Sequence, residues 1–132
     1  MPEIRRELHK RMTDFGEDPG GRLHARFVFD PGFVGFEGHF PERKILPGVC
    51  QVMCIKELLE EWKKLGVHLK ELVSARYLLP VSPGDECVVT AWDIRNSEGE
   101  YLLKAGLSRG GEKVSEFRMR VAFDGARTGE NG

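Results

Sequence analysis

GHFPERKILPGV, residues 38–49, leads directly into the longest helical pattern of the chain. The run holds one histidine, two prolines and two glycines, so it predicts a stiff turn immediately before a helix. The first N–H groups of a helix lack partners within it and can hold a carbonyl oxygen or an anion. A histidine can move a proton near neutral pH. His39, close to this helix start, is therefore the first candidate functional residue.

The helical pattern runs from about Val49 to Leu65, and Gly66 is the predicted C-cap. Its first turn and a half is apolar on nearly all sides, with Gln51 as the exception. Further along, one face is apolar and the opposite face is charged; the charged face holds Lys56, Glu57, Glu60, Glu61, Lys63 and Lys64. This pattern predicts a helix that is deeply buried at its N-terminal end and emerges toward solvent at its C-terminal end.

The segments on either side of this helix predict an α+β fold. Before it we expect a short amphipathic helix, a loop and one strand, at residues 2–12, 14–21 and 22–29. After it come four strand patterns that predict an antiparallel meander, at residues 70–79, 86–95, 101–109 and 113–123. A sheet curled around the central helix would cover its apolar end.

Composition excludes several classes of protein. The chain has 132 residues and a net charge of −1, so bulk charge predicts neither a nucleic-acid nor a membrane partner. The charged N-terminus predicts no signal peptide, and no apolar run approaches the ~20 residues of a membrane span. Three cysteines, Cys50, Cys54 and Cys87, are an odd count that argues against a disulfide framework. We expect a cytoplasmic protein in which Cys50 and Cys54 pack in the core and bind no metal.

Two motifs together resemble those of the hot-dog-fold (3R)-hydroxyacyl-acyl-carrier-protein dehydratases. The first is GHFP at residues 38–41 with PGV at 47–49, and the second is Ala75-Arg76-Tyr77 with PVSPGD at 80–85. The resemblance implies an antiparallel sheet wrapped around one long central helix, over residues 20–123. We expect an N-terminal helix and loop over 1–19, and a disordered tail over the polar, Gly-rich residues 124–132.

The resemblance also implies a function. The substrate would be a hydroxyacyl thioester on the phosphopantetheine of an acyl carrier protein or of coenzyme A, with no further cofactor. Two copies would join their sheets edge to edge, as a homodimer or a higher oligomer of dimers, with sites at the interface. His39 would be the catalytic acid or base, and the N–H of Gly48 or Val49 would hold the thioester carbonyl. Phe40, Pro47 and Met53 would complete the substrate-binding set.

The sequence departs from the family at its catalytic carboxylate. In the family this group lies six residues after the proline of PGV, where this chain has Met53, which cannot accept a proton. Glu57, one helical turn later, is our candidate catalytic replacement. Glu37 is a second candidate, and Asp85 is more simply a turn residue.

Three functions remain open from the sequence. The first is a dehydratase-like enzyme of fatty-acid, polyketide or polyene synthesis. The second is a non-catalytic acyl-thioester-binding subunit, and the third is a hot-dog thioesterase. We interpret His9, His24 and His68 as surface or strand residues, because no partner pattern accompanies them. The basic side chains near the N-terminus could meet an acidic carrier protein, although a charged helix face is usually only solvated; these are Arg5, Arg6, Lys10 and Arg11.

Overall fold

The computed structural model describes residues 2–30 and 46–125, with side chains from Arg5 onward. The predicted site residues His39, Phe40 and Glu37 lie outside the described residues, as does most of the tail. The chain forms, in order, α1 (Pro2–Arg11), β1 (Met12–Glu17), β2 (Leu23–Val28), α2 (Gly48–Lys63), β3 (Val67–Tyr77), β4 (Glu86–Ser97), β5 (Glu100–Arg109) and β6 (Glu112–Phe123).

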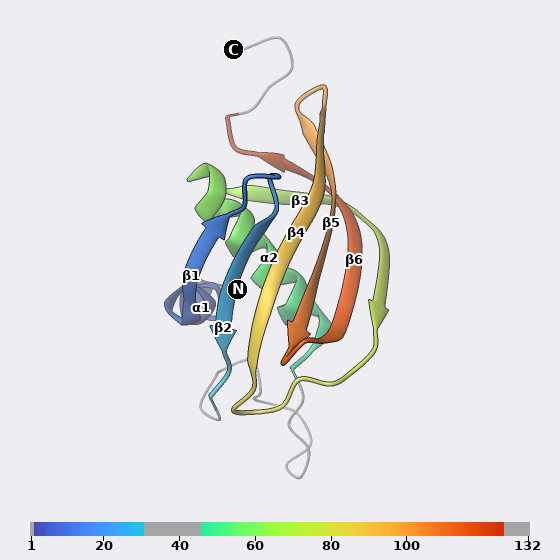
Figure 1. Ribbon diagram of the computed structural model, residues 1–132. Helices are drawn as coiled ribbons and strands as arrows, with labels where there is room; N and C mark the ends of the chain where they lie inside the picture. Colours follow the sequence, from blue (N-terminus) through green and yellow to red (C-terminus); the bar gives the residue numbers. More distant parts are fainter. Residues whose placement is uncertain (1, 31–45, 126–132) are drawn as a thin grey trace.

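One six-stranded antiparallel sheet carries the fold, in the order β1-β2-β4-β5-β6-β3. The sheet curls, and α2 lies against its concave side (Figure 1). The predicted α+β class, the central helix and the strand after each turn signal are confirmed. The alternation of β2 is clear: Leu23, Ala25 and Phe27 are buried, as predicted for one face of a half-buried strand.

The predicted four-strand meander is wrong at its first strand. Only β4, β5 and β6 follow one another in the sheet, whereas β3 pairs with β6 and forms the far edge. The link over residues 78–85 carries the chain from that edge to β4, which pairs with β2. Strand patterns identify strands but not their neighbours, so the chain order misled the prediction.

The predicted loop at residues 14–21 is wrong in its first half. Residues 12–17 form β1, which pairs with β2 through an irregular register between Thr13 and Gly16. Asp14 lies at this irregularity with a φ of 57°, and a side chain at Gly16 would overlap the His24 ring. The glycine that suggested a loop therefore allows a bulged edge strand.

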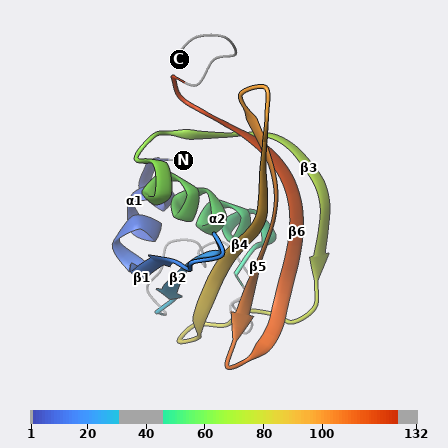
Figure 2. The same cartoon turned by 45° about the horizontal axis from the view of Figure 1, so that its top comes forward.

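The core lies between the concave face of the sheet and α2, and α1 covers a further side of α2 (Figure 2). Leu8 of α1 is fully buried there. At the N-terminal end of α2, Cys50, Val52 and Cys54 are buried, as predicted. Val49, however, is 65% exposed, so one side of this apolar end is uncovered in the single chain.

The C-terminal end of α2 differs from its prediction. The helix ends at Lys63, and the residue in left-handed conformation is Lys64, with a φ of 58°. Gly66 is not the C-cap. Its missing side chain instead leaves room for the Asp124 carboxylate, which a Cβ at residue 66 would overlap. This close approach connects the end of β6 with the start of β3, and the Asp124 N–H donates to the Gly66 carbonyl at 2.8 Å.

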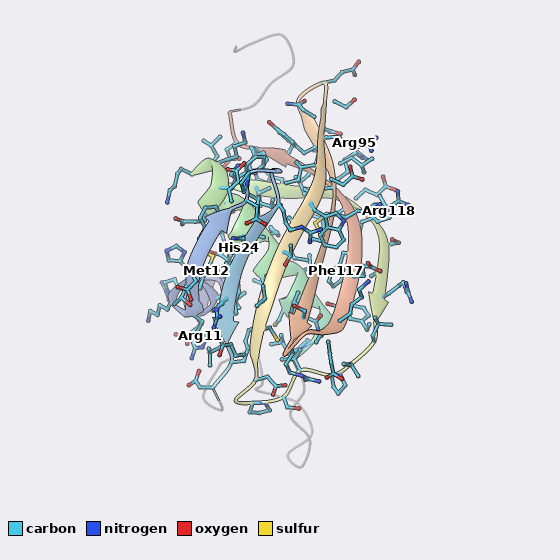
Figure 3. All side chains as sticks on the ribbon, in the orientation of Figure 1. Arg11, Met12, His24, Arg95, Phe117 and Arg118 are labelled. Carbon is cyan, nitrogen blue, oxygen red and sulfur yellow. The ribbon has the colours of Figure 1, made fainter. Side chains whose placement is uncertain are left out.

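The convex face of the sheet is covered by charged side chains in cross-strand pairs. Arg120 of β6 binds Glu100 of β5 at 2.6 Å and Glu71 of β3 at 3.0 Å. Figure 3 labels the neighbouring β6 residues Phe117 and Arg118; Phe117 is buried toward the helix and Arg118 is exposed. Within the described residues, no helix is long and apolar enough to cross a membrane.

Candidate functional site

Among the residues that the structure describes, the first backbone donors of α2 have no acceptor. Pro47 occupies the N-cap position in an extended conformation, and no side chain caps the helix. The first amides with backbone acceptors are those of Cys50 and Gln51, which donate to the Pro47 carbonyl at 3.0 and 3.3 Å. No acidic residue lies in the first turn. The N–H groups of Gly48 and Val49 are therefore available to a carbonyl oxygen from a ligand.

Tyr77, the last residue of β3, packs directly over Gly48. A Cβ built on Gly48 would lie 2.5 Å from the Tyr77 hydroxyl oxygen and 2.7 Å from its Cζ, so the ring at this position requires glycine. The ring is held edge-to-face by Phe117 of β6, with centroids 5.6 Å apart. Sequence reasoning missed Tyr77 as a site residue, although it belongs to the Ala75-Arg76-Tyr77 motif.

The predicted binding residues of the helix lie together. Pro47, Gly48 and Val49 form its start, and Met53 is one turn after Val49, partly buried. Val49 and Met53 give this side of α2 an apolar surface that no described part of the chain fully covers. An acyl chain or a second protein copy can bind such a surface.

Glu57 is buried, where the helical pattern predicted exposure. It is only 6% exposed because α1 packs over this side of α2. Its carboxylate lies 3.3 Å from the His9 ring nitrogen Nδ1 and 3.8 Å from Arg5 Nε. Burial, and next the neighbouring Glu60 carboxylate, raise the pKa of Glu57, against the opposing effects of His9 and Arg5.

The ionisable side chains of α1 have partners that the sequence pattern did not show. His9 has a partner, Glu57; likewise His24 lies 3.3 Å from Asp18, and His68 contacts Asp124. Arg5 also binds Glu60 at 3.0 Å. Arg11 binds Glu7 and Asp30, each at 2.7 Å. Ion pairs within the chain thus engage Arg5 and Arg11 on the basic face that could meet a carrier protein. A groove beside Glu57 and Glu60 is lined on the α1 side by Arg5, Arg6, His9 and Lys10.

Replacing Glu57 with glutamine is expected to change how stability depends on pH. The pKa of Glu57 is raised in the folded protein above its ordinary value of 4.5. The free energy of unfolding therefore falls as pH rises above 4.5, because the buried carboxyl group must ionise. The Glu57→Gln protein cannot ionise there. Between pH 4.5 and 7, its free energy of unfolding should rise relative to that of the wild type. Urea denaturation of both proteins across this range measures the difference. The opposite trend would show that the contacts with His9 and Arg5 outweigh burial.

The remaining candidates have structural roles. Asp85 accepts hydrogen bonds from the Ser82 N–H and from Arg109 Nη1, both at 2.8 Å, so it is a turn residue as predicted. Cys50, Cys54 and Cys87 are free and buried in the core. Burial raises the pKa of all three thiols, that of Cys87 to about 11. Because the thiolate is the nucleophile, these cysteines are poorly suited to catalysis.

Comparison with known proteins identifies relatives over most of the chain. A family model described as ApeI-like, ApeI dehydratase, matches residues 16–116. The 3-hydroxyacyl-acyl-carrier-protein dehydratase FabZ of Aliivibrio fischeri is 29% identical over 124 residues, covering 87% of this chain and 81% of the relative. The FabZ of Proteus mirabilis is similar to the same extent, 29% over 124 residues.

Solved structures show the same hot-dog architecture. The dehydratase heterocomplex ApeI:P from Xenorhabdus doucetiae matches with a TM-score of 0.69 and 18% identity, over 84% of this chain and 96% of that one. The fluoroacetyl-CoA thioesterase FlK matches with a TM-score of 0.65 and 17% identity, over 82% and 88%. At these identities the likeness concerns the fold, which serves both dehydratases and thioesterases.

Proposed function

Because the chain belongs to the ApeI-like dehydratase family, we propose that it binds 3-hydroxyacyl thioesters at the start of α2 and dehydrates them to enoyl thioesters. The observation that carries this proposal is the uncapped helix start, where Gly48 and Val49 offer two N–H groups with no acceptor among the described residues. The names of the FabZ relatives support an acyl carrier protein as the carrier of the thioester. The alternative carrier is coenzyme A.

Dehydration requires a base for the α-proton and an acid for the leaving hydroxyl group. Loss of the α-proton places negative charge on the thioester oxygen, which the N–H group of Gly48 or Val49 would stabilise. The electrons of the enolate then form the C=C bond as the 3-hydroxyl leaves with a proton as water. In this proposal His39 is the acid or base, so it either takes the α-proton or protonates the leaving hydroxyl group.

Glu57 is the helix carboxylate proposed as the second acid–base group. Its raised pKa favours a protonated carboxyl that could supply the proton to the leaving hydroxyl. Its contacts with His9 and Arg5 instead direct it toward α1. Substrate access to Glu57 would therefore require these contacts to open.

The second candidate function is an acyl-thioester-binding subunit without its own acid–base pair. Met53 occupies the position of the family's carboxylate, and α1 already engages Glu57. A relative's structure is described as a dehydratase heterocomplex, so association with another subunit has a precedent in this family. A partner subunit could then supply the missing carboxylate.

A second copy of the chain is the proposed partner at β3. This strand forms an edge of the sheet and carries the exposed apolar side chains Leu69, Leu72 and Val73. An edge strand with unpaired backbone groups can pair with the same strand of a second copy. Such pairing would also bring residues of the second copy close to Tyr77, at the end of the strand. A homodimer, or a higher oligomer of such dimers, would follow.

One assay separates the two candidate functions. The full chain is incubated with a 3-hydroxyacyl thioester, and formation of the enoyl product is followed alongside His39→Ala and Met53→Glu. Turnover by the wild type that falls at least about 100-fold in His39→Ala supports the dehydratase. Binding without turnover, with activity gained in Met53→Glu, supports the binding subunit. Failure of the wild type to bind the thioester contradicts both.

A further inference from the structure

Two buried polar side chains near the start of α2 lack hydrogen-bond partners. Gln51 is 3% exposed and its Oε1 has no partner, and Ser115 is 1% exposed and its Oγ has none. These are the only buried side-chain oxygens or nitrogens without a partner in the described part of the chain. Because buried polar groups are nearly always paired, each such group is an indication that a ligand or a water completes the site.

Both groups are placed around Tyr77 and the helix start. Ser115 is the direct cross-strand partner of Tyr77, so the two side chains share the face of the sheet that looks toward α2. Gln51 lies in the first turn of α2, and helical side chains lean toward the N-terminus of their helix. The Tyr77 hydroxyl lies over Gly48, and no other described residue hydrogen-bonds to it.

We propose that the Tyr77 hydroxyl donates a hydrogen bond to the thioester oxygen, beside the N–H groups at the start of α2. The inference rests on the proposed function, and it adds a substrate-binding residue that the helix motif does not contain. A thioester oxygen has two lone pairs and can accept both a backbone N–H and a phenol O–H. Tyr77 keeps its proton throughout, while the α-proton passes to the catalytic base.

The position of the hydroxyl favours this role over simple packing. A ring that only filled space could be phenylalanine, which would keep the edge-to-face contact with Phe117. The phenol oxygen instead lies within contact distance of the backbone that carries the free N–H groups. Tyr77 is 52% exposed in the single chain, so the described residues leave part of this side chain uncovered beside the helix start. A hydroxyl fixed beside backbone donors is a recurrent way to stabilise a developing oxyanion.

The test compares two ligands that differ in one oxygen atom. The full chain is titrated calorimetrically with a saturated acyl-CoA thioester and with the corresponding S-alkyl-CoA thioether, which lacks the carbonyl oxygen. In Tyr77→Phe, affinity for the thioester should fall roughly 3- to 10-fold, the range for one neutral hydrogen bond. Affinity for the thioether should change less than about twofold. If the protein turns over 3-hydroxyacyl-CoA, kcat should fall more than KM rises, because the bond strengthens as the oxygen gains charge.

Tyr101→Phe is the matched control. Tyr101 also contacts aromatic rings edge-to-face, with centroids 6.0 Å from Trp62 and 5.3 Å from Phe123, but it belongs to β5 and not to the helix start. Loss of the Tyr101 phenol oxygen should leave the affinities for the thioester and for the thioether unchanged. Thermal unfolding shows whether each variant keeps its fold.

The outcomes separate this inference from the proposed function. Wild-type binding of the thioester, combined with no loss in Tyr77→Phe or an equal loss for both ligands, overturns the role of Tyr77 and leaves the proposed function standing. If the wild type binds neither ligand, the proposed function and the role of Tyr77 fail together.

Discussion

Replacing Phe117 with alanine is expected to lower the free energy of unfolding by about 3–5 kcal/mol. Phe117 is fully buried on the helix side of β6, between Ala75 of β3 and Ala105 of β5. Neither alanine can fill the space that the ring would leave. The total stability of such a domain is about 5–15 kcal/mol, so the loss should be large. The urea midpoint, followed by tryptophan fluorescence, measures it.

The same substitution should weaken thioester binding. Phe117 supports the Tyr77 ring edge-to-face, and without it the ring over Gly48 gains freedom to move. Phe117→Leu is the control, because it keeps most of the buried volume and should cost less than about 1.5 kcal/mol. A loss below 1 kcal/mol in Phe117→Ala, on the order of a surface substitution, would contradict the tightly packed core described above.

Replacing Gly106 with alanine is expected to destabilise the protein by about 1–3 kcal/mol, or more. A Cβ at Gly106 would lie 2.5 Å from the backbone oxygen of Ser115 in β6. Gly106 is paired on both sides, with Thr90 of β4 and Glu116 of β6. The clash is with backbone rather than with a flexible side chain, so relief requires movement of a paired strand. Thermal unfolding and urea denaturation measure the effect.

Gly20→Ala is the matched control for Gly106→Ala. No atom lies within 4 Å of a Cβ at Gly20, and its φ is not positive. The substitution should therefore stay within about 0.5 kcal/mol of the wild type. Equal effects at the two positions would contradict a cost from the close approach of β6, because replacing an unhindered glycine with alanine lowers the entropy of the unfolded chain and does not destabilise the fold.

Local sequence patterns predicted most of the elements and the candidate residues at the start of α2. The periodicity from Val49 onward predicted α2, and alternation predicted the strands, because both signals arise from neighbouring residues on one face. The helix-start motif identified Pro47, Gly48, Val49 and Met53, which the structure brings together. Burial of Cys50 and Cys54 also followed from the helical pattern.

Other parts of the site depend on residues far apart in the chain. Glu57 reads as solvent-exposed on a helical wheel, because the wheel does not contain the covering helix α1 and its residues Arg5 and His9. The strand pattern does not distinguish Tyr77 from the other residues of its strand. Only the pairing of β3 with β6 places its ring over Gly48, about 30 residues earlier in the chain.

The sequence alone predicted the helix start, with Gly48 or Val49 as a candidate amide donor, and the loss of the family's carboxylate at Met53. All three depend on residue type and on spacing within one segment. The tertiary structure decided which strand borders that helix start, which groups engage Glu57 and which oxygens stay unpaired in the core. These depend on contacts between distant segments, and the pattern within a single segment does not contain them.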